Sequence, residues 1–174
     1  AKETKELAVT ENIDFAKIQY IINNSIVGAK LELYIEPNDN ITLNVECKDG
    51  YMMVDADGSK LYKEYYSLIN QCAPYRAERL KLEVKAKKKQ DTKTWNDLYN
   101  KASEEEKKAF TIIKEYVKAN PSSEVNVLLF DWLSSFDDKI KVYNMMDKSL
   151  FKGAYKELED RYLDVKKKVE ESRA

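Results

Sequence analysis

The sequence contains no histidine, and only two cysteines, four glycines and three prolines occur in its 174 residues. Without histidine, the chain lacks the side chain most used for general acid–base catalysis and for zinc binding. No Cys-x-x-Cys pair and no glycine-rich phosphate loop occurs, so the clearest redox and nucleotide-binding signatures are missing as well. We therefore expect no metal, no cofactor and no catalytic constellation within this chain.

Long hydrophobic runs are also missing. No apolar stretch approaches the length of a membrane span, and the start of the chain lacks the apolar middle region of a signal peptide. The 30 basic and 31 acidic residues give a net charge of −1, too small for a strong overall field that would recruit nucleic acid or an anionic membrane. We expect no nucleic-acid partner and no membrane span.

The first third of the chain does have a clear pattern, an alternation of apolar and polar residues. It is clearest over 29–36 and 41–47, where residues such as Leu31, Leu33 and Val45 share one side. This period of two is typical of antiparallel strands with one buried face. Further strands are predicted over 13–22 and 51–54 and, more weakly, 5–10, with turns at 37–40 and 48–50.

The remainder of the chain has helical spacing. Ser59 is a predicted N-cap, and Pro74 is expected to kink or interrupt the helix that follows. Ser103 and Glu106 fit a capping box, and Asn120-Pro121 fits the start of another helix. We predict an α+β protein, with a small antiparallel β-sheet (a partial β-sandwich) over residues 1–57 and about five helices over 58–174. The two regions are expected to form one structural unit.

Four candidate chemical groups deserve comparison with simpler interpretations. Cys47 and Cys72 each continue an apolar stripe, which favours two buried thiols, although a structural disulfide and a catalytic role stay open. Asp55-Ala56-Asp57-Gly58-Ser59 resembles part of a calcium loop, but the glycine is in the wrong position, which favours a strand-to-helix turn. The acidic pair 137–138 and the lysine cluster 85–89 are most simply solvated surface.

Aromatic residues are the remaining candidates for a binding site, because twelve tyrosines and two tryptophans occur in the chain. Aromatic rings can line a groove for a small molecule or a glycan, and they can equally pack between helices. Both interpretations stay open at this stage. The candidate contact residues for a ligand or a protein partner are Tyr62, Tyr66, Tyr75, Trp95 and Tyr99.

Two parts of the chain together resemble a known family. The first is Ala29-Lys30-Leu31-Glu32-Leu33-Tyr34-Ile35-Glu36-Pro37-Asn38-Asp39-Asn40-Ile41-Thr42-Leu43, followed by Asp57-Gly58-Ser59-Lys60-Leu61-Tyr62-Lys63-Glu64-Tyr65. The second is Phe110-Thr111-Ile112-Ile113-Lys114-Glu115-Tyr116-Val117 with Asn120-Pro121-Ser122-Ser123-Glu124-Val125. Their order resembles the uncharacterised N-terminal domain of many Bacteroidetes cell-envelope proteins. Asn38 departs from that family's usual glycine, and the N-terminal strands look curtailed.

The resemblance carries functional expectations. That family usually precedes a thioredoxin-like domain of the TlpA or ResA kind, which holds a Cys-x-x-Cys pair that this chain lacks. The resemblance implies a periplasmic or cell-surface location, often with a lipid anchor upstream, and a non-catalytic role beside thiol–disulfide exchange. The implied partners are a thioredoxin-like domain, another protein or a second copy of the chain. A small-molecule or glycan-binding protein is the alternative.

Overall fold

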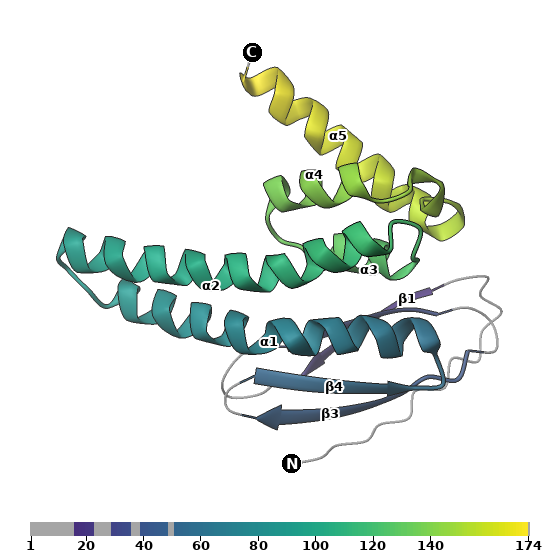
Figure 1. Cartoon of the computed structure of the whole chain (residues 1–174), viewed down its shortest axis with the longest axis horizontal. Helices are drawn as coiled ribbons and strands as arrows, with labels where there is room; N and C mark the ends of the chain where they lie inside the picture. Colours follow the sequence, from purple (N-terminus) through teal and green to yellow (C-terminus); the bar gives the residue numbers. More distant parts are fainter. Residues whose placement is uncertain (1–15, 23–28, 36–38, 49–50, 174) are drawn as a thin grey trace. The chain divides into compact units, whose positions relative to one another are not determined.

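The computed structural model describes residues 16–22, 29–35, 39–48 and 51–173, and these residues form an α+β fold, which confirms the predicted class (Figure 1). Four strands come first and helices follow. The strands are β1 (Ala16–Ile22), β2 (Ala29–Ile35), β3 (Thr42–Lys48) and β4 (Tyr51–Asp57). The helices are α1 (Lys60–Lys87), α2 (Thr92–Ala119), α3 (Val125–Trp132), α4 (Phe136–Met145) and α5 (Lys156–Arg173), with short 3-10 turns at Lys148–Leu150 and Gly153–Tyr155.

The strands pair as two antiparallel hairpins, β1 with β2 and β3 with β4. Within the described residues, the two hairpins are separate two-stranded sheets. The register matches apolar positions, for example Ile18 with Leu33 and Val45 with Val54. Because side chains alternate between the faces of a strand, the directly opposed Val45 and Val54 lie on the same face of their hairpin. The strand predicted over 5–10 lies outside the described residues.

A glycine makes the turn from β4 into α1. Gly58 has a φ of +86°, and a Cβ at this position would lie 1.8 Å from the carbonyl oxygen of Asn40. Glycine is therefore required for both the left-handed conformation and the close approach. The next residue, Ser59, caps α1 as predicted, because its hydroxyl accepts a hydrogen bond from the Tyr62 N–H at 3.3 Å.

The sequence predicts a kink or an interruption at Pro74, and the interruption does not occur, because α1 runs unbroken from Lys60 to Lys87. Proline removes one backbone hydrogen bond within a helix. Buried residues on both sides of Pro74, including Cys72 and Ala77, hold the two parts of the helix against their neighbours. Packing of this kind can outweigh the loss of a single hydrogen bond.

The predicted capping box at Ser103 is also wrong, because α2 begins eleven residues earlier, at Thr92. Asp91 provides the cap instead, since its carboxylate oxygen Oδ1 accepts a hydrogen bond from the Thr94 N–H at 2.8 Å. Ser103 lies on the exposed side of the helix interior. Glu106, the expected partner in the box, makes ion pairs with α1.

The segment from Asn120 to Glu124 is a turn rather than the first turn of a helix, so that prediction is wrong by about one helical turn. The carbonyl groups of Asn120 and Pro121 accept hydrogen bonds from the Asn126 side-chain amide, at 2.7 Å and 3.1 Å. The backbone partners of these carbonyls are the Ser123 N–H and the Asp147 N–H, a turn and a long-range contact rather than a helical ladder. Helix α3 starts at Val125.

The chain divides into two compact units, residues 1–113 and residues 114–174, with the boundary inside α2. The predicted boundary between strand and helix regions, at residues 57 and 58, is a change of secondary structure within the first unit. In that unit α1 lies along β4 (Figure 1). The chain then reverses direction, so that α2 runs antiparallel to α1 and the two form a helical hairpin (Figure 1). The second unit contains the end of α2 and helices α3, α4 and α5.

Candidate functional site

Two of the predicted contact residues, Tyr62 and Tyr66, lie in the core of the first unit, with 1% and 3% of their surface exposed. The Tyr62 hydroxyl accepts a hydrogen bond from the Tyr34 N–H at 2.5 Å and donates one to the Tyr34 carbonyl at 2.8 Å. Burial raises the pKa of Tyr62 well above its ordinary value, opposed by the hydrogen bond with the Tyr34 backbone. Tyr62 therefore ties α1 to β2.

The other predicted contact residues lie elsewhere along the helical hairpin. Trp95 and Tyr99 stack on each other in the first turns of α2, with ring centroids 4.2 Å apart. Tyr75 is half-buried in α1, with the Lys108 ammonium 6.0 Å from its ring centre. Tyr62 and Tyr66 lie in the first two turns of α1, whereas Trp95 and Tyr99 follow the opposite end of this helix. A helix of 28 residues is about 42 Å long at ~1.5 Å per residue. The five residues therefore do not form a single groove.

Asn70 makes a second contact between α1 and a strand. Its side-chain Oδ1 accepts a hydrogen bond from the Val54 N–H at 2.9 Å, and its Nδ2 donates to the Val54 carbonyl at 2.8 Å. The amide therefore satisfies both backbone groups at this point of β4. Unpaired strand edges invite association with other chains, so this pairing protects β4 at Val54.

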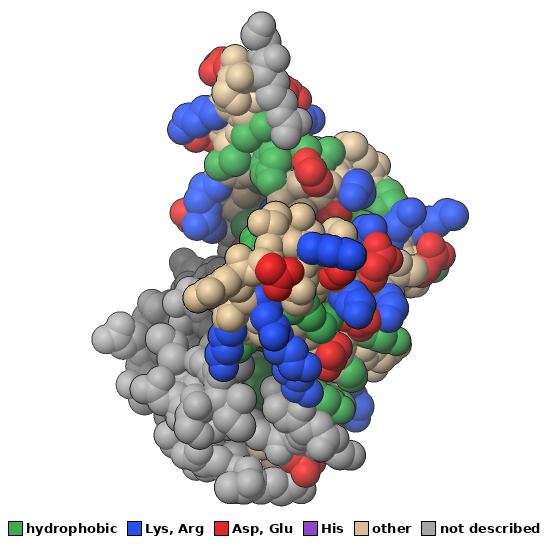
Figure 2. All heavy atoms as spheres, turned by 90° about the vertical axis from the view of Figure 1, so that its left-hand side faces the viewer, with side chains coloured by type: hydrophobic (Ala, Val, Ile, Leu, Met, Phe, Trp, Pro, Cys, Tyr) green, Lys and Arg blue, Asp and Glu red, His purple; other side chains and the backbone are tan. Residues whose placement is uncertain are grey.

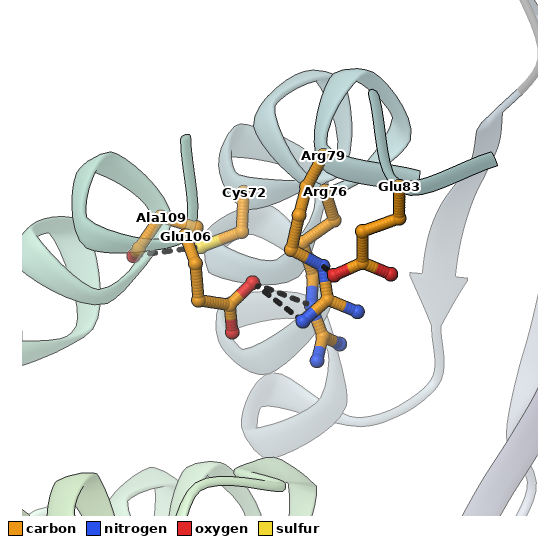
Figure 3. Close-up of polar contacts among 6 residues, drawn as sticks. All are labelled: Cys72, Arg76, Arg79, Glu83, Glu106 and Ala109. Carbon is orange, nitrogen blue, oxygen red and sulfur yellow. Dashed lines mark hydrogen bonds and ion pairs between the residues drawn. The ribbon is translucent and has the colours of Figure 1, made fainter. Parts of the chain in front are cut away.

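An ionic cluster joins α1 to α2 (Figure 3). Glu106 of α2 lies 3.2 Å from the Arg79 guanidinium and 3.9 Å from that of Arg76, and Arg79 also lies 3.6 Å from Glu83. The paired side chains are only 24% to 29% exposed. Burial lowers the pKa of Arg76, and the Glu106 carboxylate opposes this effect. The cluster fixes how the two helices pack.

Cys72 lies beside this cluster as a free and fully buried thiol. Its Sγ lies 3.4 Å from the carbonyl oxygen of Ala109, to which it donates a weak hydrogen bond (Figure 3). Burial raises the pKa of Cys72 to about 11, with Arg76 lowering it and Glu106 raising it to smaller extents. A reactive cysteine needs the opposite, an exposed thiol with a lowered pKa. Cys72 thus fits the buried-thiol interpretation, and the Cys47 side chain lies outside the described part.

In the second unit, aromatic rings gather around Phe130, which is fully buried. The Phe130 ring packs edge-to-face against Phe151 and Tyr162, with centroids 5.5 Å and 5.1 Å apart. The Tyr143 hydroxyl donates a hydrogen bond to the largely buried Glu159 at 2.8 Å. Burial, together with Glu159, raises the pKa of Tyr143 to about 12. These contacts join α3, α4 and α5.

The acidic residues of the calcium-loop-like segment and of the pair 137–138 lie near lysines. Asp57 is exposed and lies 3.7 Å from Lys63, while Asp138 pairs with Lys141 at 2.9 Å within α4. Across the described residues, no group of three or more cysteine, aspartate or glutamate side chains is arranged to hold a metal ion. None of the described helices combines the length and apolar character needed to cross a bilayer.

No family model, curated protein or solved structure matches this chain.

The sequence analysis did not identify Asn70 as a contact to a strand or Glu106 as the ion-pair partner of Arg76 and Arg79. The sequence does contain a pattern that indicates each contact. Asn70 follows Tyr62 and Tyr66 at intervals of four, which places it on the same buried face of α1. Glu106 lies between the buried residues Ala102 and Ala109 at helical spacing. A polar residue on an otherwise apolar stripe indicates a partner from another element, because buried polar groups need one.

Proposed function

We propose that this chain is a non-catalytic accessory domain of the cell envelope that binds a protein partner, a thioredoxin-like thiol–disulfide oxidoreductase domain. One observation carries the non-catalytic part of the proposal. Three buried or part-buried polar groups of the first unit hold elements of the fold together: Tyr62 and Asn70 bind strand backbones, and Glu106 binds α1. Groups committed in this way are poorly placed to exchange protons with a substrate.

The nature of the partner and the exported location are supported by the sequence resemblance to the Bacteroidetes envelope domain. The burial of Cys72 and its raised pKa support a division of labour, in which thiol chemistry belongs to the partner. The alternative of a glycan- or small-molecule-binding groove has no such support, because Tyr62 and Tyr66 lie in the core.

The proposal is tested by titrating the isotope-labelled chain with a thioredoxin-like domain of the TlpA or ResA kind and following backbone amide shifts by NMR. We expect saturable shifts confined to one surface, because a specific interface involves a limited patch on each partner. A thioredoxin-like domain with both active-site cysteines changed to serine should bind equally well, since the Cys72 thiol, the one that the structure describes, is buried.

Two results would contradict the proposal. The first is an absence of shifts at all concentrations of the partner domain. The second is reduction of a protein disulfide by this chain alone, at a rate above that of the reductant without enzyme. The second result would assign thiol chemistry to the chain itself.

A further inference from the structure

The closed end of the α1–α2 hairpin is strongly basic. This end, residues 84–99, is called the hairpin tip below; it holds five exposed lysines and two aspartates, a local net charge of +3. The whole chain has a net charge of −1, so the composition conceals this local excess. Figure 2 faces this end and shows Lys and Arg side chains gathered there, with acidic side chains among them. The lysines are Lys85, Lys87, Lys88, Lys89 and Lys93.

The hairpin tip also exposes apolar surface. Val84 is 51% exposed and Trp95 is 39% exposed, and they are two of the four large hydrophobic residues that are exposed in the described part of the chain. Tyr99 stacks on Trp95, which supports the indole ring from one side. Tryptophan and tyrosine rings favour the boundary between water and lipid, where an apolar body and a polar edge can both be satisfied.

We propose that the hairpin tip docks on the surface of an anionic lipid bilayer. The combination of clustered lysines with an exposed tryptophan at the end of a helical hairpin favours lipid over a protein partner. A stable protein interface covers about 800 Å² on each side and has an apolar centre. Two exposed apolar side chains at a helix-to-helix turn provide much less, whereas a bilayer surface adapts to a small convex end.

The charges of the hairpin tip set the expected strength of this binding. Each lysine near an anionic surface strengthens binding by about fivefold. Asp91 and Asp97 oppose two of the five lysines, which leaves about a 100-fold preference for anionic over neutral lipid. Glu83 lies next to the tip, but it pairs with Arg79 at 3.6 Å. Added salt should weaken the binding, because exposed charges are screened over ~10 Å at about 0.1 M salt.

The test uses the intact chain and two kinds of vesicle. One is pure phosphatidylcholine, and the other contains about one third phosphatidylglycerol, which supplies the negative surface. We expect the chain to sediment with the anionic vesicles only and to be released by salt. Brominated acyl chains in those vesicles should quench fluorescence in the wild type but not in Trp95→Phe, which retains Trp132 as an internal reference.

A matched pair of variants separates local from overall charge. Lys87→Gln/Lys88→Gln/Lys89→Gln removes three adjacent lysines from the tip, and Lys166→Gln/Lys167→Gln/Lys168→Gln removes three adjacent lysines from α5. Both variants lose the same charge. We expect the tip variant to bind anionic vesicles at least about tenfold more weakly and the α5 variant to bind as the wild type does. Circular dichroism checks that both retain their helices.

Three results would overturn the inference: equal binding to both vesicle types, equal loss of binding in the two triple variants, or no quenching of Trp95. Binding to an acidic polypeptide such as polyglutamate with no binding to vesicles would also overturn it, in favour of an acidic protein partner. The lipid surface differs from the partner of the proposed function, so either proposal can fail without the other.

Discussion

The side-chain amide of Asn70 pairs with both backbone polar groups of Val54, with hydrogen-bond distances of 2.9 Å and 2.8 Å. A single asparagine on α1 therefore takes the place that a neighbouring strand would occupy at this point of β4. Tyr62 acts in the same way on Tyr34 of β2, through one hydroxyl group that both accepts and donates. Helix α1 thus contacts both hairpins by polar pairing, in addition to packing along β4.

Asn70→Ala should lower the free energy of unfolding by about 2 kcal/mol, because it leaves the Val54 N–H and carbonyl without these partners in a part-buried position. Urea unfolding followed by circular dichroism measures the change. The adjacent Gln71→Ala is the control, since Gln71 is exposed and its side chain donates to the Ser67 carbonyl of its own helix. A loss no larger than that of the control would show that the Asn70 pairing has little weight.

Tyr62→Phe should lower the free energy of unfolding by about 1–2 kcal/mol while preserving ring packing. The Tyr34 N–H and carbonyl would lose a shared partner, and hydrogen exchange at the Tyr34 amide should accelerate. Tyr99→Phe serves as the reference, because it retains the stacking on Trp95 and is expected to change stability by less than about 0.5 kcal/mol. Unchanged exchange at Tyr34 in the Tyr62 variant would contradict the assigned contact.

Glu106→Gln should destabilise the helical hairpin by about 1–2 kcal/mol, because Arg76 and Arg79 would share a part-buried site without their anion. Glu104→Gln removes a carboxylate from the same helix, where it pairs with the exposed Lys107, and should cost almost nothing. Thermal unfolding of the two variants measures the difference. Similar melting temperatures for both would indicate that the Glu106 cluster is energetically no different from a surface ion pair.

The free energy of unfolding should fall as the pH rises from the ordinary pKa of the Cys72 thiol to its raised pKa in the folded chain. Its thiol has an ordinary pKa of 9.0 and a pKa of about 11 in the folded chain, so the unfolded state loses its proton first. The native state binds more protons in this interval, and the contribution of Cys72 is therefore complete below about pH 9 and lost by about pH 11.

The measurement is the free energy of unfolding in urea at about pH 8 and about pH 11, for the wild type and for Cys72→Ala. The wild type should lose about 2 kcal/mol more than the variant over this interval, at ~1.4 kcal/mol for each pKa unit. Buried tyrosines such as Tyr62 affect both proteins alike, so they cancel in the comparison. Identical pH dependence in the two proteins would refute the raised thiol pKa.

The strands and the start of α1 could be predicted because their signals are local. Alternation over 29–36 and 41–47 is typical of strands, and the Gly58-Ser59 step carries its own requirements, a positive φ and a capping hydroxyl. These features depend on neighbours a few residues away. The start of α2 was missed because residues 92–102 mix polar and aromatic side chains, and Ser103 offered a stronger local capping signal than Asp91.

The contacts that hold the fold together could not be derived in the same way. The bonds from Tyr62 to Tyr34 and from Asn70 to Val54 join residues that are 28 and 16 positions apart. Which strand lies against which turn of α1 is decided by packing, and the sequence pattern alone does not specify it. The same packing decides whether Tyr62 and Tyr66 line a binding groove or lie in the core, so the sequence left both interpretations open.

The central claim, that this chain supports thiol chemistry without performing it, is tested most directly by a thiol-free variant. Cys47→Ser/Cys72→Ala and the wild type are compared for their affinity for a thioredoxin-like domain and for their effect on that domain's rate of disulfide reduction. We predict that both quantities are the same for the two proteins, provided that circular dichroism shows the variant to be folded. A folded variant that no longer supports the partner's reaction would contradict the claim and assign a reacting thiol to this chain.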